Sequence, residues 1–279
     1  QAGIPQDRIA HTVSRNCASG MEAILQGWQI VHSGRAKLVV VGGTESMSKI
    51  PMLVSEATKR KLLRISRART WRQSLAAYLQ LRPSDLKPVL GVELGLTDPT
   101  CGLNMGETAE VLAQEFAITR DEQDAFAVES HRKAVAAAKR CFLSGEIAAM
   151  QVQAQELKQD VGPRENQSME QLAKLRPIFK KNGTVTAGNS CPLTDGATSL
   201  VVCDESQRVH LDKPALGFVT GSAIAGCDPR RMGLGPVFAT AKLLQSTGLQ
   251  LSDFDLFEIN EAFAAQVLAC LRAFESKKF

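Results

Sequence analysis

The sequence lacks any long hydrophobic run. No segment approaches the ~18 consecutive apolar residues that a membrane-spanning helix requires, so we expect no transmembrane segment. Residues 1–6 carry neither a charged nor an apolar signal-peptide region, so we expect no secretory signal at this point. The first residue, Gln1, is not Met, and we therefore expect the true N-terminus to lie upstream.

The sequence also lacks a strong charge of one sign and paired cysteines. Its 33 basic and 29 acidic residues give a net charge of +4, which permits anionic ligands and gives no indication of nucleic acid. The seven cysteines are scattered, odd in number and without Cys-x-x-Cys spacing, so we expect neither a disulfide framework nor a metal site. This cysteine usage favours a reducing compartment.

The residues around Cys17 predict a reactive thiol. A short extended run leads into residues 12–20, and an apolar helical stripe follows from Met21 to Val31 and ends at Ser33-Gly34. A thiol where a strand passes into a helix meets the positive end of the helix dipole and unpaired backbone N–H groups, which favour the nucleophilic thiolate. The local sequence also fits a simpler alternative, in which Cys17 is a small buried hydrophobe.

Alternating strand and helix patterns, with 44% hydrophobic residues, predict an α/β protein with a sizeable core. The apolar run 37–41 is typical of a parallel strand buried on both faces, and Gly42-Gly43 after it predicts a tight turn. Residues 151–170 are polar and predict a loop. Further helices are predicted at 106–116, 120–140 and 236–248, and strands at 11–14, 197–203, 216–220 and 251–259.

An ordered set of motifs runs along the chain. Residues 16–23, Asn-Cys-Ala-Ser-Gly-Met-Glu-Ala, closely resemble the acylated-cysteine motif of the thiolases, the acetyl-CoA C-acyltransferase family. Further matches, in the family's order, are residues 42–48, 104–110, 185–189, 195–197, 232–236 and 260–264. The ordered set is far more specific than any one motif, and the resemblance covers essentially the whole chain.

The resemblance implies a thiolase-like α/β fold. It has two similar α/β halves, with a mainly helical loop domain inserted in the first half, and the C-terminal half is incomplete in this chain. We expect residues 1–49 and 175–208 to form the N-terminal domain and residues 50–174 the inserted, CoA-binding loop domain. Residues 209–279 then belong to the C-terminal domain.

The resemblance also implies roles for individual residues. Cys17 matches the cysteine that takes up the acyl group. Asn260 matches the asparagine that orients a catalytic water in the oxyanion site, although without the motif it would be assigned as a helix N-cap. The positions implied to bind CoA or substrate are Met105, Phe179, Ala187, Gly188, Ser190, Cys191, Ala262 and Phe263.

Two positions depart from the family. Cys191 stands where a serine is common, and a thiol is a poorer hydrogen-bond partner. Asn104 stands where many biosynthetic thiolases have a histidine, which argues against a short-chain, biosynthetic enzyme.

The basic stretch 59–72 is more similar to the branch that contains the fatty-acid-oxidation thiolases and the trifunctional-enzyme β subunits.

The implied reaction is acyl transfer between a 3-ketoacyl-CoA and CoA through an acyl-cysteine intermediate, either thiolytic cleavage that releases acetyl-CoA or the reverse condensation. Coenzyme A and acyl-CoA are substrates, and no metal or redox cofactor is expected. The family suggests a homodimer or higher oligomer, or an assembly with a hydratase/dehydrogenase subunit. The expected compartment is the cytoplasm, or the mitochondrial matrix in a eukaryote.

Two family motifs that follow the asparagine motif are absent. They are a Gly-His-Pro motif, whose histidine activates the nucleophile, and a Cys-x-Gly motif, whose cysteine is the acid/base. We therefore expect a chain truncated at both ends and inactive as a fragment, and we interpret Cys270 as packing. Two alternatives stay open, a catalytically silent subunit that binds CoA or serves in assembly, and a ketoacyl synthase-like condensing enzyme.

The basic stretch 59–72 allows two interpretations. Seven Lys and Arg residues alternate there with apolar residues such as Leu62, Leu63 and Trp71. The pattern fits a solvated amphipathic helix. It equally fits a surface for anionic groups, such as the phosphates of coenzyme A, anionic lipid or an acidic partner subunit.

Overall fold

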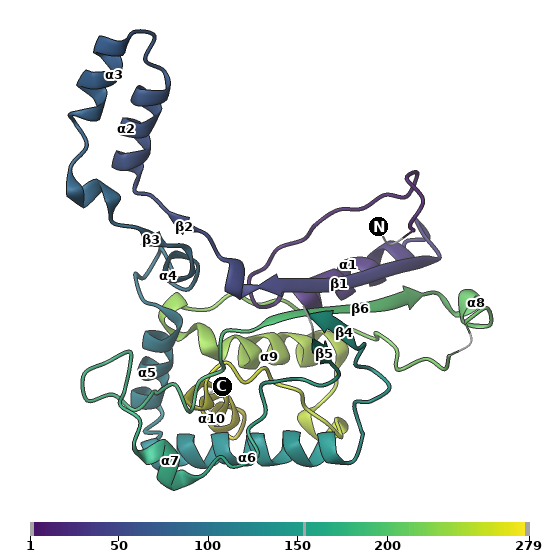
Figure 1. Ribbon diagram of the computed structural model, residues 1–279. Coiled ribbons are helices and arrows are strands. Elements are labelled where there is room, and N and C mark those ends of the chain that lie inside the picture. The colour runs from purple at the N-terminus through teal and green to yellow at the C-terminus, as the bar shows by residue number, and fades with distance from the viewer. Residues whose placement is uncertain (1–2, 153–154, 212, 277–279) are drawn as a thin grey trace. The chain divides into compact units, whose positions relative to one another are not determined.

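The computed structural model describes residues 3–152, 155–211 and 213–276, shown in Figure 1. The chain divides into two compact units. The first contains the described residues of 1–48 and 194–223, and the second those of 49–193 and 224–279. The domain division expected from the resemblance stays a prediction.

The first unit is built on an antiparallel strand pair. Strand β1 (Leu38–Ser46) pairs with β6 (Asp195–Cys203), and helix α1 (Ser19–His32) packs against them, as Figure 1 shows. Gly27 permits this packing, because a Cβ there would lie 2.5 Å from Val41 Cγ1. Val41 is buried, whereas Val40 on the opposite face is 61% exposed. The predicted parallel strand buried on both faces is therefore wrong, since its partner is a distant segment that local sequence does not reveal.

The glycine pair in β1 has a different role from the one predicted. Gly42 and Gly43 lie inside the strand and pair with Ser199 and Thr198, so the predicted tight turn is wrong. A Cβ on Gly42 would lie 2.3 Å from the backbone oxygen of Thr198. The missing side chain thus allows the two backbones to approach. Beyond β6, this unit holds the short helix α8 (Glu205–Arg208).

Three predicted strands do not form in the described residues. Segments 11–14, 216–220 and 251–259 contain no strand, although η4 (Leu251–Asp253) is a 3-10 helix. A strand requires a neighbouring strand to satisfy its backbone groups, and none pairs with these segments. Conversely, the loop predicted at 151–170 is wrong at its start, where β4 (Met150–Val152) pairs with β5 (Gln155–Leu157).

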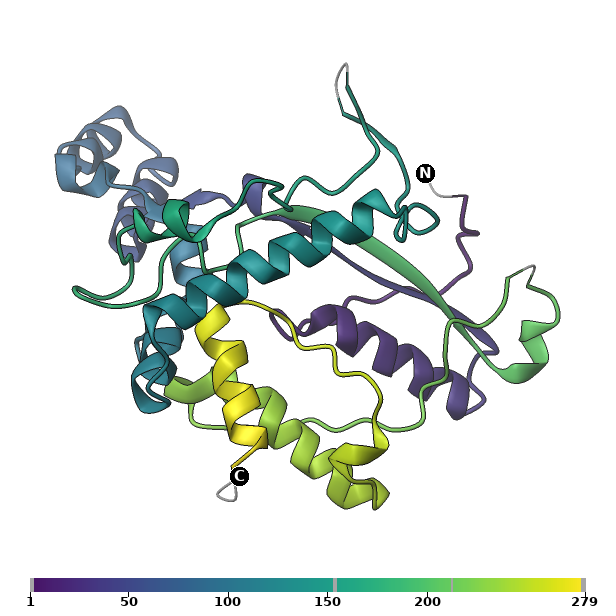
Figure 2. The same ribbon diagram turned by 90° about the horizontal axis from the view of Figure 1, so that it is seen from below.

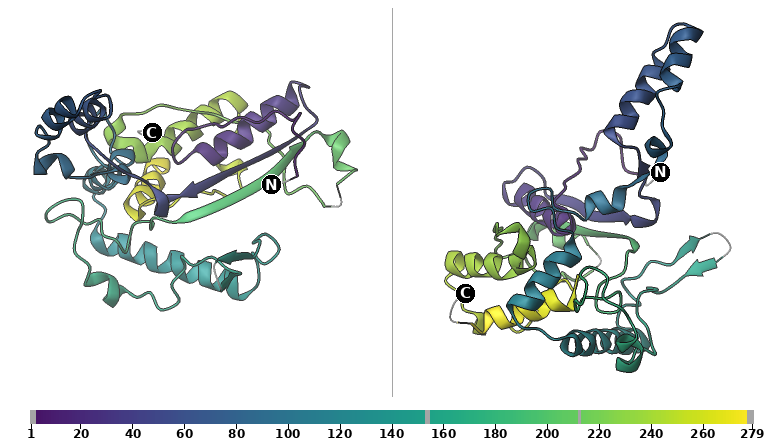
Figure 3. Two further views of the ribbon diagram at one scale, coloured as in Figure 1. Left: turned by 45° about the horizontal axis from the view of Figure 1, so that its top comes forward. Right: turned by 90° about the vertical axis from the view of Figure 1, so that its left-hand side faces the viewer.

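The basic stretch forms two helices of the second unit. Helices α2 (Glu56–Ser66) and α3 (Trp71–Tyr78) contact each other, as the right-hand panel of Figure 3 shows in dark blue. Trp71, at the start of α3, is 71% exposed, and Leu75 and Tyr78 are exposed one and two turns later. The short 3-10 helix η1 (Met47–Lys49) spans the boundary between the two units. The smaller elements that follow it in the second unit are β2 (Met52–Leu53), η2 (Pro83–Leu86), β3 (Val89–Leu90) and α4 (Gly91–Gly95).

Helices form the core of the second unit. Helix α10 (Ala264–Phe274) contacts α5 (Met105–Glu115), α6 (Arg120–Lys139) and α9 (Gly235–Thr247), and Figure 2 shows it in yellow beside α6 and α9. Leu112, Leu234 and Ala269 are among the fully buried residues of this core. The remaining elements are α7 (Met169–Ala173) and η3 (Pro229–Leu234).

The helices predicted at 106–116, 120–140 and 236–248 are confirmed within one residue at each end. Local signals explain this agreement. Thr119 and Glu122 form the capping box that opens α6, and Gly248, with φ of 74°, ends α9. Each signal acts within one helical turn and is therefore visible in the sequence.

Cys270 lies in this helical core. It is fully buried, and its thiol donates to the Gly233 oxygen at 3.1 Å. Burial raises the pKa of the Cys270 thiol to about 11, because the apolar surroundings disfavour the thiolate. Its predicted role in packing therefore fits its environment.

Candidate functional site

Cys17 lies on a tight turn directly ahead of α1. Asn16 adopts a left-handed backbone with φ of 46°, which is uncommon for a residue other than glycine. The turn is closed by N–H donation from Ala18 to the Arg15 oxygen at 3.0 Å and from Ser19 to the Asn16 oxygen at 3.1 Å. Cys17 is exposed, so its thiol is accessible at the positive end of a helix.

Hydrogen bonds and an ion pair of Arg15 and Ser19 stabilise this turn. The Ser19 hydroxyl accepts from the Arg15 N–H at 2.8 Å and donates to the Asn16 oxygen at 2.7 Å. The Arg15 guanidinium also forms a 3.1 Å ion pair with Glu22 in the first turn of α1. The small and polar residues beside Cys17 thus hold the turn in place.

In the second unit, an aromatic pair joins two of the predicted binding positions. The rings of Phe179 and Phe263 meet edge to face, with centroids 6.0 Å apart. Gly106, next to Met105 at the start of α5, lies close to this pair, since a Cβ there would be 2.3 Å from the Phe179 ring. Met105, Phe179 and Phe263 therefore come from three separate segments that meet at one end of α5.

Backbone hydrogen bonds join two further binding segments. The Cys191 N–H donates to the Ala262 oxygen at 2.9 Å, and the Ala264 N–H donates to the Asn189 oxygen at 3.0 Å. Ser190 and Phe263 form an isolated β-bridge between these contacts. The segment that follows Asn260 is therefore fastened along segment 188–191.

The remaining predicted site residues differ in environment. Ala187 is exposed, whereas Gly188 is buried against leucine side chains, with Leu172 Cδ2 at 2.3 Å from the place of a Cβ. Asn260 is exposed. It belongs to the second unit together with the eight predicted binding residues, whereas Cys17 belongs to the first unit.

A cavity of about 250 Å³ opens beside segment 188–191. Its wall includes Ser190 and Cys191, together with three polar residues that sequence reasoning missed. These are Ser130, His131 and Glu261, and the Ser130 hydroxyl donates to Glu261 Oε2 at 2.5 Å. The only local signal for Ser130 and His131 is a short polar run on α6, which is typical of a solvated helix face, whereas Glu261 lies within the motif 260–264.

His131 has a defined protonation state in this cavity wall. Its Nδ1 accepts from the Arg164 N–H at 3.1 Å, so the neutral ring carries its proton on Nε2. The pKa of His131 lies below its ordinary value of 6.5, first because burial disfavours the cation and second because Arg164 repels it, while Glu261 acts in the opposite direction.

Acid is expected to break the contact between His131 and Arg164. Because the unfolded chain takes up the proton more readily, stability falls as the pH drops below 6.5. An NMR titration should place the His131 midpoint below 6.5, and amide exchange of Arg164 should accelerate through that midpoint. A His131→Gln variant removes this pH step, and a midpoint at or above 6.5 would contradict the assignment.

A buried carboxylate accepts hydrogen bonds from the residues that precede segment 188–191. Glu110 on α5 is 5% exposed. It accepts from the Thr184 and Val185 N–H groups, each at 2.8 Å. Glu110 lies among the apolar positions of α5, and a charged residue on an apolar helix face was the sequence signal that could have revealed it.

The described residues hold neither a candidate metal cluster nor a membrane-spanning helix. Residues 3–152, 155–211 and 213–276 contain no group of three or more His, Cys, Asp or Glu side chains placed to hold a metal ion. Within the same ranges, no helix combines the length and hydropathy needed to cross a bilayer.

The fold and the exposed Cys17 turn describe an α/β protein with an accessible thiol at a helix start. The family model described as Thiolase, N-terminal domain, matches residues 1–206, and that described as Thiolase, C-terminal domain, matches residues 213–278. The chain belongs to the thiolase family, as its motifs predicted.

Named relatives agree with this assignment. The chain is 37% identical over 274 residues to a 3-ketoacyl-CoA thiolase of Yersinia enterocolitica, covering 97% of this chain and 62% of the relative. It is 38% identical to a probable acetyl-CoA acyltransferase of Staphylococcus aureus, covering 96% and 65%. The chain thus spans less than two thirds of the length of these relatives.

Solved structures confirm the predicted thiolase fold class. Human mitochondrial 3-ketoacyl-CoA thiolase matches with a TM-score of 0.84 and 34% identity, covering 99% of this chain and 66% of that one. The same enzyme in complex with CoA matches with a TM-score of 0.83 and 36% identity, covering 98% and 64%.

Proposed function

We propose that the whole protein transfers an acyl group between a 3-ketoacyl-CoA and CoA through an acyl-Cys17 intermediate. The observation that carries this proposal is the exposed Cys17 thiol on the Asn16 turn, at the position that matches the family's acylated cysteine. The names of the relatives, 3-ketoacyl-CoA thiolase and acetyl-CoA acyltransferase, support the same chemistry. The thiolase family models favour this reaction over that of a ketoacyl synthase.

In the cleavage direction, the Cys17 thiolate attacks the C3 carbonyl carbon of the 3-ketoacyl-CoA. A carbon–sulfur bond forms and the C2–C3 bond breaks, so that the electron pair leaves on C2 and takes up a proton to give acetyl-CoA. The CoA thiolate then attacks the acyl-Cys17 thioester and releases a shortened acyl-CoA. Condensation runs through the same steps in reverse. No oxidation occurs, so the proposal requires no cofactor besides CoA.

The other site residues have supporting roles in this proposal. Asn260 orients a water in the oxyanion site, because a neutral amide can donate to it without adding charge. The eight positions from Met105 to Phe263 bind CoA or substrate, and all of them except Ser190 and Cys191 line the tunnel for the pantetheine arm. Their contacts through the Phe179–Phe263 pair and along segments 188–191 and 262–264 support a common surface.

The assembly and compartment are also proposals. The family suggests a homodimer or higher oligomer, or association with a hydratase/dehydrogenase subunit, and a role in fatty-acid oxidation. The protein is proposed to work in the cytoplasm, or in the mitochondrial matrix of a eukaryote. Size measurement of the native complex with mass identification of its subunits tests the assembly.

Acyl labelling tests the function. The protein is incubated with acetoacetyl-CoA or a longer 3-ketoacyl-CoA, quenched rapidly in acid, and measured by intact and peptide mass spectrometry. We expect an acyl adduct on the peptide that contains Cys17, lost on addition of CoA and absent in Cys17→Ala. The substrate that labels faster indicates the chain-length class. No adduct with either substrate, despite CoA binding, would contradict the proposal and favour a silent subunit.

A further inference from the structure

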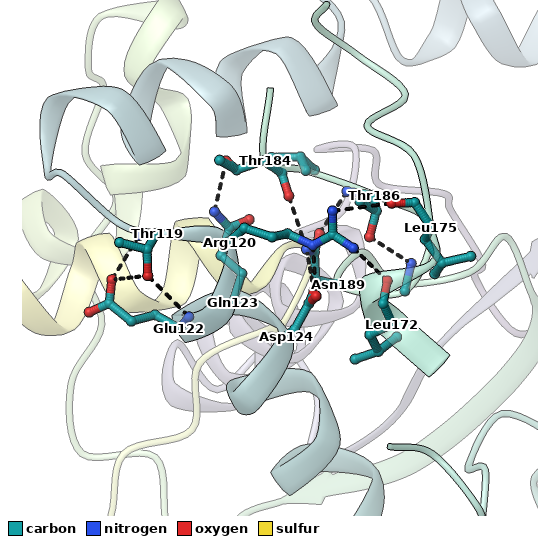
Figure 4. A network of polar contacts seen from close by, with 12 residues as sticks. Thr119, Arg120, Glu122, Gln123, Asp124, Leu172, Leu175, Thr184, Thr186 and Asn189 are labelled. Atoms are coloured by element: carbon teal, nitrogen blue, oxygen red, sulfur yellow. Dashed lines mark hydrogen bonds and ion pairs between the residues drawn. The ribbon is translucent and has the colours of Figure 1, made fainter. Parts of the chain in front are cut away.

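A buried carboxylate on α6 uses both of its oxygens. Asp124 is 2% exposed. Its Oδ2 accepts from Arg120 Nε at 2.7 Å, and its Oδ1 accepts from Asn189 Nδ2 at 2.9 Å, as Figure 4 shows. A buried carboxylate is stable only when it is paired and hydrogen-bonded, and these two partners supply both requirements. Asp124 therefore connects α6 to the segment that carries Gly188, Ser190 and Cys191.

Asn189 closes the turn that begins at Thr186 and runs into segment 188–191. It is 2% exposed, and its Oδ1 accepts from the Thr186 N–H at 2.8 Å. Its Nδ2 donates to the Thr184 oxygen at 3.1 Å as well as to Asp124. A carboxylate can only accept hydrogen bonds, so the amide nitrogen of Asn189 must face Asp124 on α6. The amide oxygen of Asn189 therefore faces Thr186.

Asn189 also contacts the segment that leads into α10, through its backbone. Its carbonyl accepts from the Ala264 N–H at 3.0 Å, at the start of α10. The next residues continue the contact through the Ser190–Phe263 bridge. Ala264 lies only four residues after Asn260, so a shift of Asn189 moves the segment that Asn260 precedes.

Arg120 fastens a third segment to the same carboxylate. Its guanidinium donates to the Leu172 oxygen at 2.5 Å and to the Leu175 oxygen at 3.2 Å. The side chains of these leucines pack on Gly188, since a Cβ there would lie 2.3 Å from Leu172 Cδ2 and 2.6 Å from Leu175 Cδ1. Figure 4 shows this fork of contacts around Arg120. Segment 188–191 is therefore held by Asp124 through Asn189, and by Leu172 and Leu175 through Gly188.

We propose that Asp124 and Asn189 form a positioning pair that sets the geometry of segments 186–191 and 262–264, and through them the place of Asn260. The inference rests on the proposed acyl transfer, because it assigns these segments to the acyl-CoA. Neither residue touches the reacting atoms, so both act through the residues that they hold. Catalysis is sensitive to such placement, since a 1 Å displacement can cost about 10²-fold in rate.

Hydrogen exchange tests the coupling directly. In Asp124→Asn, one of the two acceptors is replaced by a donor that faces another donor, so the network opens locally. We expect the amides of Thr186 and Ala264 to exchange at least about 10-fold faster, with α9 unchanged. The double variant D124N/N189D reverses donor and acceptor and keeps one hydrogen bond, so it should recover part of the loss.

A matched control separates positioning from general stability. Val237→Ala opens the core around α9, in a buried cluster that includes neither Asp124 nor Asn189. Its exchange rates should rise in α9 and stay unchanged at Thr186 and Ala264. If Asp124→Asn accelerates exchange in all elements alike, or if the double variant recovers nothing, the pair is only structural and the proposal is overturned.

Kinetics of the full-length protein test the link to function. We expect kcat of Asp124→Asn to fall by about 10–100-fold while Cys17 still forms an acyl adduct, whereas Val237→Ala keeps its kcat. Unchanged kcat and KM in Asp124→Asn would overturn the inference. A wild-type protein without any adduct would instead refute the proposed function, and the exchange experiment would still decide whether the pair positions the segments.

Discussion

Replacing Cys17 by serine is expected to abolish the acyl-enzyme adduct and to lower the rate of thiolysis by at least about 10³-fold. The variant keeps the Asn16 turn and the start of α1, because the side chain of Cys17 is exposed and serine is almost the same size. What changes is the nucleophile. A hydroxyl is far weaker than a thiol without a strong adjacent base, so the first C–S bond of the reaction has no replacement.

The measurement combines rapid-quench peptide mass spectrometry with steady-state thiolysis of acetoacetyl-CoA. A matched control is Cys141→Ser, which removes another exposed thiol outside the candidate site and should retain both the adduct and the rate. An adduct on any other cysteine, with none on Cys17 in the wild-type protein, would refute the assignment of the nucleophile.

Replacing Glu110 by alanine is expected to lower the free energy of unfolding by about 2–6 kcal/mol, because each buried donor that loses its acceptor costs about 1–3 kcal/mol. The substitution removes the carboxylate that accepts from the N–H groups of Thr184 and Val185, and it leaves those buried donors without a partner. It also leaves a void beside Gly183, where no Cβ fits now because it would lie 2.1 Å from Glu110 Oε1. Denaturant unfolding measures the loss.

The same helix offers a control for this prediction. Glu115 forms a 2.6 Å ion pair with Arg231 and is considerably more exposed than Glu110. Glu115→Ala should therefore cost only about 0–1 kcal/mol. Glu110→Gln keeps one acceptor and should fall between the two alanine variants. Equal losses in Glu110→Ala and Glu115→Ala would show that the buried hydrogen bonds contribute little.

Replacing Glu110 should also destabilise segment 188–191 locally. Thr184 and Val185 directly precede the turn that Asn189 closes, so amide exchange should accelerate from residue 184 to residue 191. CoA affinity should fall with it if these residues bind the pantetheine arm. This experiment therefore connects a stability measurement to the proposed binding roles of Gly188, Ser190 and Cys191.

The sequence by itself determined the features that depend on neighbours within one or two helical turns. The capping box at Thr119 and Glu122, and the glycine that ends α9 at Gly248, predicted helix ends to within one residue. The helical stripe from Met21 to Val31 likewise predicted α1, which begins two residues earlier, at Ser19. The family also followed from the sequence, because its motifs occur in one order along the whole chain.

Only the tertiary structure decided which distant segments meet. The paired residues of β1 and β6 lie 149 to 165 positions apart in the sequence, from Ser46↔Asp195 to Leu38↔Cys203. This pairing gives an antiparallel pair, with Gly42 at a close backbone approach, in place of the predicted parallel strand with a glycine turn. Glu110 reaches Thr184 across 74 residues, and Asp124 reaches Asn189 across 65. The physical reason is that a helix satisfies its backbone within four residues, whereas a strand or a buried carboxylate must find its partner elsewhere in the chain.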